Sequence, residues 1–259
     1  MALTNIEKYY NKFNEDKRLK TRHGQVEFLT TTKYILKYLS KGKNAKILDV
    51  GAGTGAYSKF LYDNGFDVTA VELVEKNLSV LKQNVPNINA FKGNALNLKK
   101  FKDNSFDCVL LLGPMYHLFS IEEKLKALNE AKRVVKSSGL IFVAYCLNEY
   151  AVISYAFKEN NFNQVVKNGK LTKDFKVVST QEDLYSYDNL KIINTLKKQS
   201  NLKRVKILSP DGPTDYMRQT INKMDNQTFL GYINFVQKNC ERKDLLGAGS
   251  HIVDILKKE

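Results

Sequence analysis

Three closely spaced glycines and one acidic side chain are the residues of this chain that most clearly indicate a ligand-binding site. The run Ile-Leu-Asp-Val-Gly-Ala-Gly-Thr-Gly places Gly51, Gly53 and Gly55 between a short apolar segment and an apolar helix. Glycine lacks a Cβ atom, so such a turn can bring backbone N–H groups close to a nucleotide-like ligand. Glu72 ends the next apolar segment, 21 positions after Gly51, at a spacing where a carboxylate can reach a ribose.

Two cofactors fit a glycine turn followed by an acidic residue. A nicotinamide dinucleotide favours Gly-x-Gly-x-x-Gly, but the third glycine here comes one residue early. Asp49 would place a carboxylate near a pyrophosphate, and a carboxylate there suits a cationic ligand better. The run Leu-Asp-Val-Gly-Ala-Gly-Thr-Gly with Glu72 resembles the glycine motif of class I S-adenosylmethionine-dependent methyltransferases. A glycine-rich turn in an unrelated α/β protein is the alternative.

The resemblance implies S-adenosyl-L-methionine as the cofactor and assigns roles to particular residues. Asp49 would support the ammonium of the cofactor, Glu72 would bind the ribose hydroxyls, and Leu73 would cover the adenine. Asn94 stands where the family usually has an acidic residue, and it could equally be an ordinary turn residue after Gly93. The complete set of expected cofactor-binding residues is Tyr10, Asp49, Gly51, Ala52, Gly53, Glu72, Leu73, Asn94, Ala95, Leu112 and Gly113.

A second motif follows the fourth expected strand. The stretch Leu-Leu-Gly-Pro-Met-Tyr-His-Leu resembles the corresponding loop of a large bacterial group of small-molecule methyltransferases. It differs from the Asn/Asp-Pro-Pro-Tyr motif of base and glutamine N-methyltransferases. His117 is the candidate catalytic base, since histidine can take a proton near neutral pH. Alternatively, His117 braces the loop through its hydrogen bonds; Tyr116 either lines the substrate pocket or packs.

The N-terminal region supplies a further candidate cluster. Tyr9 and Tyr10 lie on one side of a polar helix expected over residues 4–20, and Arg22 and His23 follow it. In related methyltransferases an N-terminal helix closes over the cofactor, where an aromatic ring can stabilise a sulfonium. The resemblance therefore implies Tyr10 near the cofactor and Arg22 and His23 near the substrate, while an ordinary amphipathic helix is the alternative.

Five alternations of strand and helix predict a doubly wound α/β fold. Apolar segments at residues 46–50, 66–71, 89–92, 106–112 and 140–145 are separated by helical patterns, including one that starts at Ser120 with a capping box and stops at Ser137–Gly139. The resemblance implies a mostly parallel, seven-stranded sheet with helices on both faces and an antiparallel last strand near residues 250–256. We expect one methyltransferase domain over residues 1–259, with an N-terminal helical cap (1–44), a cofactor-binding core (45–147) and a C-terminal half covering the acceptor (148–259).

Composition limits the environment and the partners. The chain has 259 residues, a formal net charge of +14 and three widely separated cysteines, which predict neither a disulfide framework nor a metal centre. Its positive charge is dispersed rather than concentrated in a basic tail, so a small-molecule acceptor is favoured over nucleic acid. We expect a cytoplasmic enzyme without a membrane anchor. An RNA or tRNA methyltransferase, a nicotinamide-dependent oxidoreductase and a non-catalytic cofactor-binding protein stay open as alternatives.

Overall fold

The computed structural model describes residues 5–12, 21–39 and 44–259. Its seven strands form one sheet in the order β3-β2-β1-β4-β5-β7-β6. The parallel strands are β1 (Lys46–Val50), β2 (Asp67–Glu72), β3 (Asn89–Lys92), β4 (Phe106–Leu111) and β5 (Val135–Cys146). β7 (His251–Lys257) lies antiparallel between β5 and β6 (Lys203–Leu208). This arrangement confirms the predicted fold, including the antiparallel last strand.

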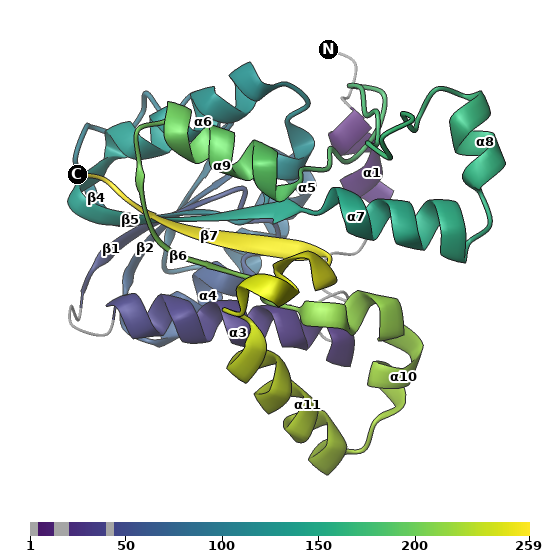
Figure 1. Cartoon of the computed structure of the whole chain (residues 1–259). Coiled ribbons are helices and arrows are strands. Elements are labelled where there is room, and N and C mark those ends of the chain that lie inside the picture. Colours follow the sequence, from purple (N-terminus) through teal and green to yellow (C-terminus); the bar gives the residue numbers. More distant parts are fainter. Residues whose placement is uncertain (1–4, 13–20, 40–43) are drawn as a thin grey trace.

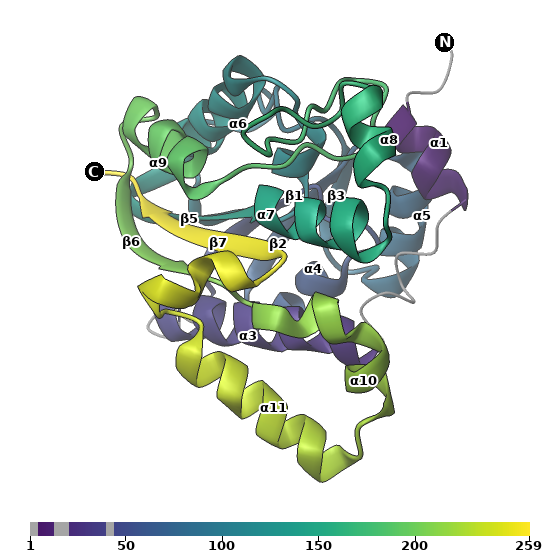
Figure 2. The same ribbon diagram turned by 45° about the vertical axis from the view of Figure 1, so that its right-hand side comes forward.

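Helices cover both faces of the sheet (Figure 1). α3 (Arg22–Leu39) and α4 (Ala56–Asp63) lie on one face, and α6 (Ile121–Val134) and α9 (Leu190–Gln199) lie on the other. Figure 2 shows α1 (Asn5–Lys12) beside α5 (Glu75–Asn84). The remaining helices are α7 (Asn148–Ala151), which continues as a π-helix to Lys158, α8 (Phe162–Lys167), α10 (Arg218–Lys223) and α11 (Asn226–Asn239). Short 3₁₀ turns span Pro114–His117, Gly212–Met217 and Lys243–Ala248.

The central strands are apolar because the sheet separates two hydrophobic cores. In β4, Val109 and Leu111 point into the core that contains α6 and α9, whereas Cys108 and Leu110 point into the core that contains α3 and α4. Successive side chains of a strand alternate between the faces of a sheet, so a strand covered on both faces needs an unbroken apolar run. The resulting rigid sheet fixes the positions of the loops at its carboxyl edge.

α6 begins as predicted but ends earlier than its sequence pattern indicates. Ser120 and Glu123 form the expected reciprocal capping box. The helix stops at Val134, and the predicted stop signal at residues 137–139 lies inside β5 instead. The backbone N–H of Ser138 donates to the carbonyl of Lys258 at 2.8 Å, so pairing with the distant C-terminal segment draws these residues into the sheet. Residues 13–20 of the predicted N-terminal helix lie outside the described residues.

One buried ion pair connects α6 to the segment that leads into α9. Lys124 Nζ lies 2.7 and 2.5 Å from the two carboxylate oxygens of Asp188, and both side chains are almost completely buried. Burial raises the pKa of Asp188, although Lys124 opposes this shift. The backbone of Asp188 in turn bonds to Cys146 at the end of β5 and to Asn148. The pair therefore holds this segment against the edge of the sheet.

Removing one partner of this ion pair should lower the stability of the folded protein. Lys124→Met leaves the Asp188 carboxylate buried without a counter-charge, and we expect the free energy of unfolding to fall by about 3–5 kcal/mol. Urea denaturation at pH 7 measures this change. The double variant Lys124→Met/Asp188→Leu should lose less than the single variant. Lys59→Met breaks an exposed pair with Asp63 and should change stability by no more than about 0.5 kcal/mol; equal losses for the buried and exposed pairs would contradict the prediction.

Candidate active site

A cavity of about 360 Å³ opens at the carboxyl edge of the parallel strands. Its walls come from the loops after β1, β2, β3 and β4, from α1, and from residues 181 and 183. Ligands of open α/β sheets bind at this edge, because the loops of neighbouring strands converge there. All the residues predicted to bind the cofactor line this cavity, together with Tyr116 and His117: Tyr10, Asp49, Gly51, Ala52, Gly53, Glu72, Leu73, Asn94, Ala95, Leu112 and Gly113.

The glycine turn after β1 and the loop after β4 touch each other. Gly51 adopts φ 71°, and a Cβ atom there would lie 2.8 Å from the ring of Pro114. A Cβ atom on Gly113 would lie 2.8 Å from the carbonyl oxygen of Gly51. Both positions therefore require glycine, because no real Cβ atom tolerates such contacts. This close approach narrows the floor of the cavity between β1 and β4.

Glu72 is held rigidly at the end of β2. Its Oε2 accepts the N–H of Gly53 and its Oε1 accepts the N–H of Val74, both at 2.8 Å. The residue is only 5% exposed, and burial raises the pKa of its carboxyl although these N–H bonds and Asn77 oppose the shift. The carboxylate thus joins the glycine turn to the loop after β2. Asn77 also lines the cavity, and no sequence signal marked it.

Asp49 is the second buried carboxylate of the cavity. Its Oδ2 accepts the hydroxyl of Ser58 at 2.7 Å. Burial raises the pKa of Asp49 to about 6, with the nearby negative charge of Glu72 adding to the effect. No lysine or arginine is among the described residues that line the cavity, whereas Glu123 and Asp183 add two further carboxyl groups. The cavity is therefore electrostatically suited to a cation.

Asn94 caps its own turn. Its Oδ1 accepts the N–H of Leu96 at 2.9 Å, which is the bond expected of a turn residue. An asparagine side chain has both an acceptor oxygen and a donor nitrogen. Because the oxygen of Asn94 is used in the turn, its amide nitrogen can still donate to a ligand. The structure thus places Asn94 in the cavity wall and gives it the turn role as well.

His117 lies at the centre of an aromatic cluster. Its Nδ1 lies 2.9 Å from the carbonyl oxygen of Leu184, so Nδ1 carries the proton and Nε2 accepts the Tyr10 hydroxyl at 3.1 Å. The ring of Tyr185 stacks on the imidazole with centroids 5.3 Å apart. Burial lowers the pKa of His117, although the bond to Leu184 opposes this. Leu184 and Tyr185 belong to the C-terminal half that the sequence predicts to cover the acceptor, but their contacts with His117 were not predicted.

Arg22 and His23 lie elsewhere, outside the lining of this cavity. The guanidinium of Arg22 donates to the carbonyl oxygen of Asp225 and to Asn226, each at 2.8 Å. His23 Nδ1 lies 3.1 Å from Asn222 Oδ1. The structure therefore does not bring these two residues together with Tyr116 in the cavity lining. They join the start of α3 to α10 and α11 instead.

Comparison with known proteins agrees with this geometry. The methyltransferase domain family matches residues 48–143. A protein of Alkaliphilus oremlandii described as an uncharacterized methyltransferase is 28% identical over 162 residues, 62% of this chain and 69% of that protein. The demethylmenaquinone methyltransferase of Renibacterium salmoninarum is 40% identical over 99 residues, but these are only 38% of this chain and 40% of that enzyme.

A solved structure extends the likeness to the entire fold. An S-adenosylmethionine-dependent methyltransferase from Thermotoga maritima aligns with a TM-score of 0.60 over 98% of this chain and 99% of that one, at 18% identity. None of the helices in the described ranges combines the length and apolar character that a membrane crossing requires. Residues 48–143 therefore match the methyltransferase domain family, and the chain has the fold of an S-adenosylmethionine-dependent methyltransferase.

Proposed function

We propose that the cavity at the carboxyl edge binds S-adenosylmethionine and that the protein transfers its methyl group to an O, N or C atom of a small molecule. The observation that carries this proposal is the charge of the cavity, where Asp49 and Glu72 lie buried and no described lining residue is Lys or Arg. A pyrophosphate would be repelled by these groups, whereas an ammonium and a sulfonium would be attracted.

The residues present fit the parts of this cofactor. Glu72 would hold the ribose hydroxyls, because its carboxylate lines the cavity and accepts hydrogen bonds. Asp49 would attract the ammonium, and Leu73, Asn94 and Ala95 would enclose the adenine. The bound cofactor supplies an electrophilic methyl group. The protein's task is then to place the acceptor atom in line with that group and to exclude water.

The acceptor side is proposed to lie where Tyr10, Tyr116 and His117 line the cavity. Both ring nitrogens of His117 already have partners, Leu184 and Tyr10, so His117 acts first as a positioning residue. If an acceptor must lose a proton, the Tyr10 hydroxyl can take it while passing its own proton to Nε2 of His117. The imidazolium formed in this way must release its proton to water before the next turnover, and the lowered pKa of His117 favours that release.

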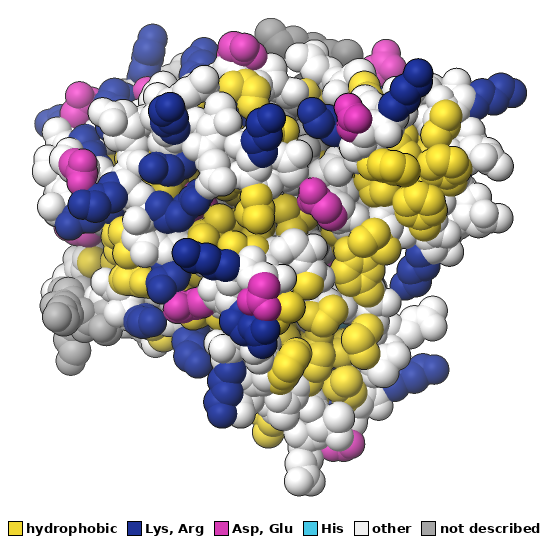
Figure 3. All heavy atoms as spheres, in the orientation of Figure 1, with side chains coloured by type: hydrophobic (Ala, Val, Ile, Leu, Met, Phe, Trp, Pro, Cys, Tyr) yellow, Lys and Arg dark blue, Asp and Glu magenta, His cyan; other side chains and the backbone are white. Residues whose placement is uncertain are grey.

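Two features support a small-molecule acceptor: an enclosed space beside the cofactor cavity and the distribution of charge on the surface. A second cavity of about 430 Å³ adjoins the first through Asp183 and is lined mainly by aliphatic and tyrosine side chains. On the face drawn in Figure 3, lysines and arginines lie among acidic, apolar and other polar groups. One relative, demethylmenaquinone methyltransferase, is also named for a small molecule. We propose that residues 148–259 cover this acceptor space.

Cofactor binding tests the proposal directly. In calorimetric titrations, S-adenosylhomocysteine should bind in the micromolar range and NADH should not. Glu72→Ala should weaken binding of S-adenosylhomocysteine by more than tenfold, because it removes the ribose partner and releases the N–H groups of Gly53 and Val74. Glu75→Ala, which changes a neighbouring exposed carboxylate, is the matched control and should bind normally. Preference for NADH would reject the proposed cofactor, and normal binding by Glu72→Ala would reject the ribose assignment.

Affinity should depend on pH through Asp49. Below its pKa of about 6 the group is neutral and cannot attract an ammonium; above it the carboxylate can. We therefore expect the affinity for S-adenosylhomocysteine to rise by up to about tenfold from pH 5 to pH 7. The raised pKa of Glu72 acts in the same direction. Asp49→Asn should flatten this profile, and an affinity that falls with pH would contradict the assignment.

His117 should affect cofactor binding through α1. His117→Ala removes the contacts with the Tyr10 hydroxyl and the Leu184 carbonyl, each worth about 1 kcal/mol, so we expect affinity to fall at least about fivefold. His23→Ala is the matched control, since His23 lies outside the cavity, and it should bind normally. Calorimetry with S-adenosylhomocysteine measures both variants. Equal effects of the two substitutions would show that α1 is not held through His117.

A further inference from the structure

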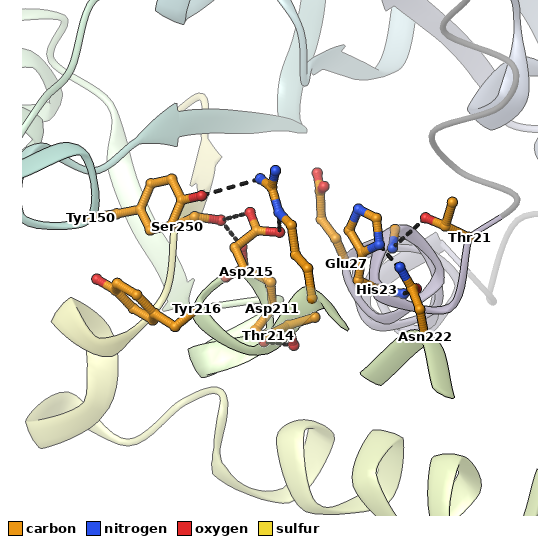
Figure 4. Close-up of polar contacts among 12 residues, drawn as sticks. Thr21, His23, Glu27, Tyr150, Asp211, Thr214, Asp215, Tyr216, Asn222 and Ser250 are labelled. Carbon is orange, nitrogen blue, oxygen red and sulfur yellow. Dashed lines mark hydrogen bonds and ion pairs between the residues drawn. The ribbon is translucent and has the colours of Figure 1, made fainter. Parts of the chain in front are cut away.

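A second polar cluster lies at the same edge of the sheet, outside the cofactor cavity (Figure 4). Asp211 follows β6, Asp215 lies in the next 3₁₀ turn, and Ser250 and His251 stand at the start of β7. His251 pairs with Cys146, the last residue of β5, which places the cluster beside the carboxyl ends of the parallel strands. Nothing in the proposed methyl transfer requires these residues.

Three potential ligand atoms surround the hydroxyl of Ser250. Its Oγ lies 2.5 Å from Asp215 Oδ2 and 2.9 Å from His251 Nδ1, and it also contacts Asp211 Oδ2. His251 Nδ1 itself lies 2.8 Å from Asp211 Oδ2. One ligand atom from each of Asp211, Asp215 and His251 lies within 4.8 Å of the others. Such a set of two carboxylates and an imidazole is the type that binds a divalent ion.

The contacts within the cluster converge on one point. The Ser250 hydroxyl contacts Asp211, Asp215 and His251, and His251 Nδ1 also contacts Asp211. A cation at the place of this hydroxyl would have two carboxylates and an imidazole around it.

An unpartnered hydroxyl next to Asp211 supports the same conclusion. Ser209 is 2% exposed, and its Oγ has no hydrogen-bond partner among the described residues. Ser209 Oγ and Asp211 Oδ1 lie 2.3 and 2.5 Å from the position that a Cβ atom on Gly249 would take. This buried hydroxyl and the Asp211 carboxylate therefore both lie against Gly249, the residue before Ser250. A buried polar atom without a partner is rare, and ordered water or a metal-bound water would satisfy it.

The charges around the cluster attract a cation. Glu27 of α3 adds a third carboxylate, 4.0 Å from His251 Nδ1, while Arg218 is the cation paired with Asp215. Burial would lower the pKa of His251, yet Glu27 and the hydrogen bond to Asp211 help to raise it well above its ordinary value. His251, Glu27 and Asp215 are each slightly exposed, at 18%, 14% and 11% of their side chains, so an ion can reach them.

We propose that Asp211, Asp215 and His251 bind a first-row divalent metal ion such as Mn²⁺ or Zn²⁺. The imidazole favours these ions over Mg²⁺ and Ca²⁺, which take oxygen ligands. The ion would take the place now filled by the Ser250 hydroxyl, which turns aside or stays as a fourth ligand. It would fasten the segment after β6 to the start of β7. The proposal is independent of cofactor binding.

The test is a titration of the complete chain with Mn²⁺ after treatment with EDTA and dialysis. Free Mn²⁺ is followed by electron paramagnetic resonance at pH 7.5, where one Mn²⁺ per chain should bind and excess Zn²⁺ should displace it. Asp215→Asn and His251→Gln should each weaken Mn²⁺ binding at least tenfold. Asp244→Asn alters an exposed carboxylate paired with Arg242 and is the matched control, which should bind like the unaltered chain.

A parallel titration with S-adenosylhomocysteine separates loss of the metal site from loss of folding. Asp215→Asn and His251→Gln should keep normal affinity for this ligand, and circular dichroism should show an unchanged fold. If neither Mn²⁺ nor Zn²⁺ binds stoichiometrically to the unaltered chain, the proposal is overturned and protons alone neutralise the cluster. Binding that persists unchanged in both variants would also overturn it. Failure of S-adenosylhomocysteine to bind would affect only the proposed function.

Discussion

The buried carboxylate of Glu72 is the interaction on which the cavity depends. A carboxylate inside a protein must be surrounded by donors, because water no longer solvates it. Glu72 meets this requirement by accepting the N–H groups of Gly53 and Val74, so the turn after β1 and the loop after β2 are fixed by one side chain. Gly51, in the same turn, lies so close to the ring of Pro114 that only glycine fits there. The geometry of the glycine turn is thus set in part by an acidic residue at the end of the neighbouring strand.

The antiparallel pairing of β7 with β5 extends the site into the C-terminal half of the chain. It places His251 beside Cys146, whose carbonyl also accepts the N–H of Asp188 and so holds the segment around Asp188 at the end of β5. The same segment passes along the loop after β4, where the backbone N–H of Ser186 donates to the carbonyl of Tyr116 at 2.8 Å. The cofactor cavity and the polar cluster at β7 therefore share one structural support, although they have different linings.

Local sequence patterns predicted those parts of the site that are formed by one loop and the strand before it. The glycine turn, Glu72, and the loop that carries His117 all lie beside the strands that position them, so period and spacing were enough to find them. Asn77, in the first turn of α5, matches no motif, and the contact of Tyr185 with His117 was not predicted because it depends on packing between distant segments. Arg22 and His23 were misplaced for the same reason, since α10 and α11 determine where the start of α3 points. The Asp211–His251 pair is separated by 40 positions, and no local pattern joins such residues.

The electrostatics of the cavity also explain why a strong general base is not its central feature. Asp49 and Glu72 are costly to ionise where they lie, and their raised pKa values express that cost. A cationic ligand offsets it, so the binding of that ligand and the ionisation of these groups favour each other. His117, by contrast, is neutral and already shared between Leu184 and Tyr10. With the proposed function, the buried carboxylates would stabilise the cofactor, and the reaction at the acceptor would depend on position and enclosure.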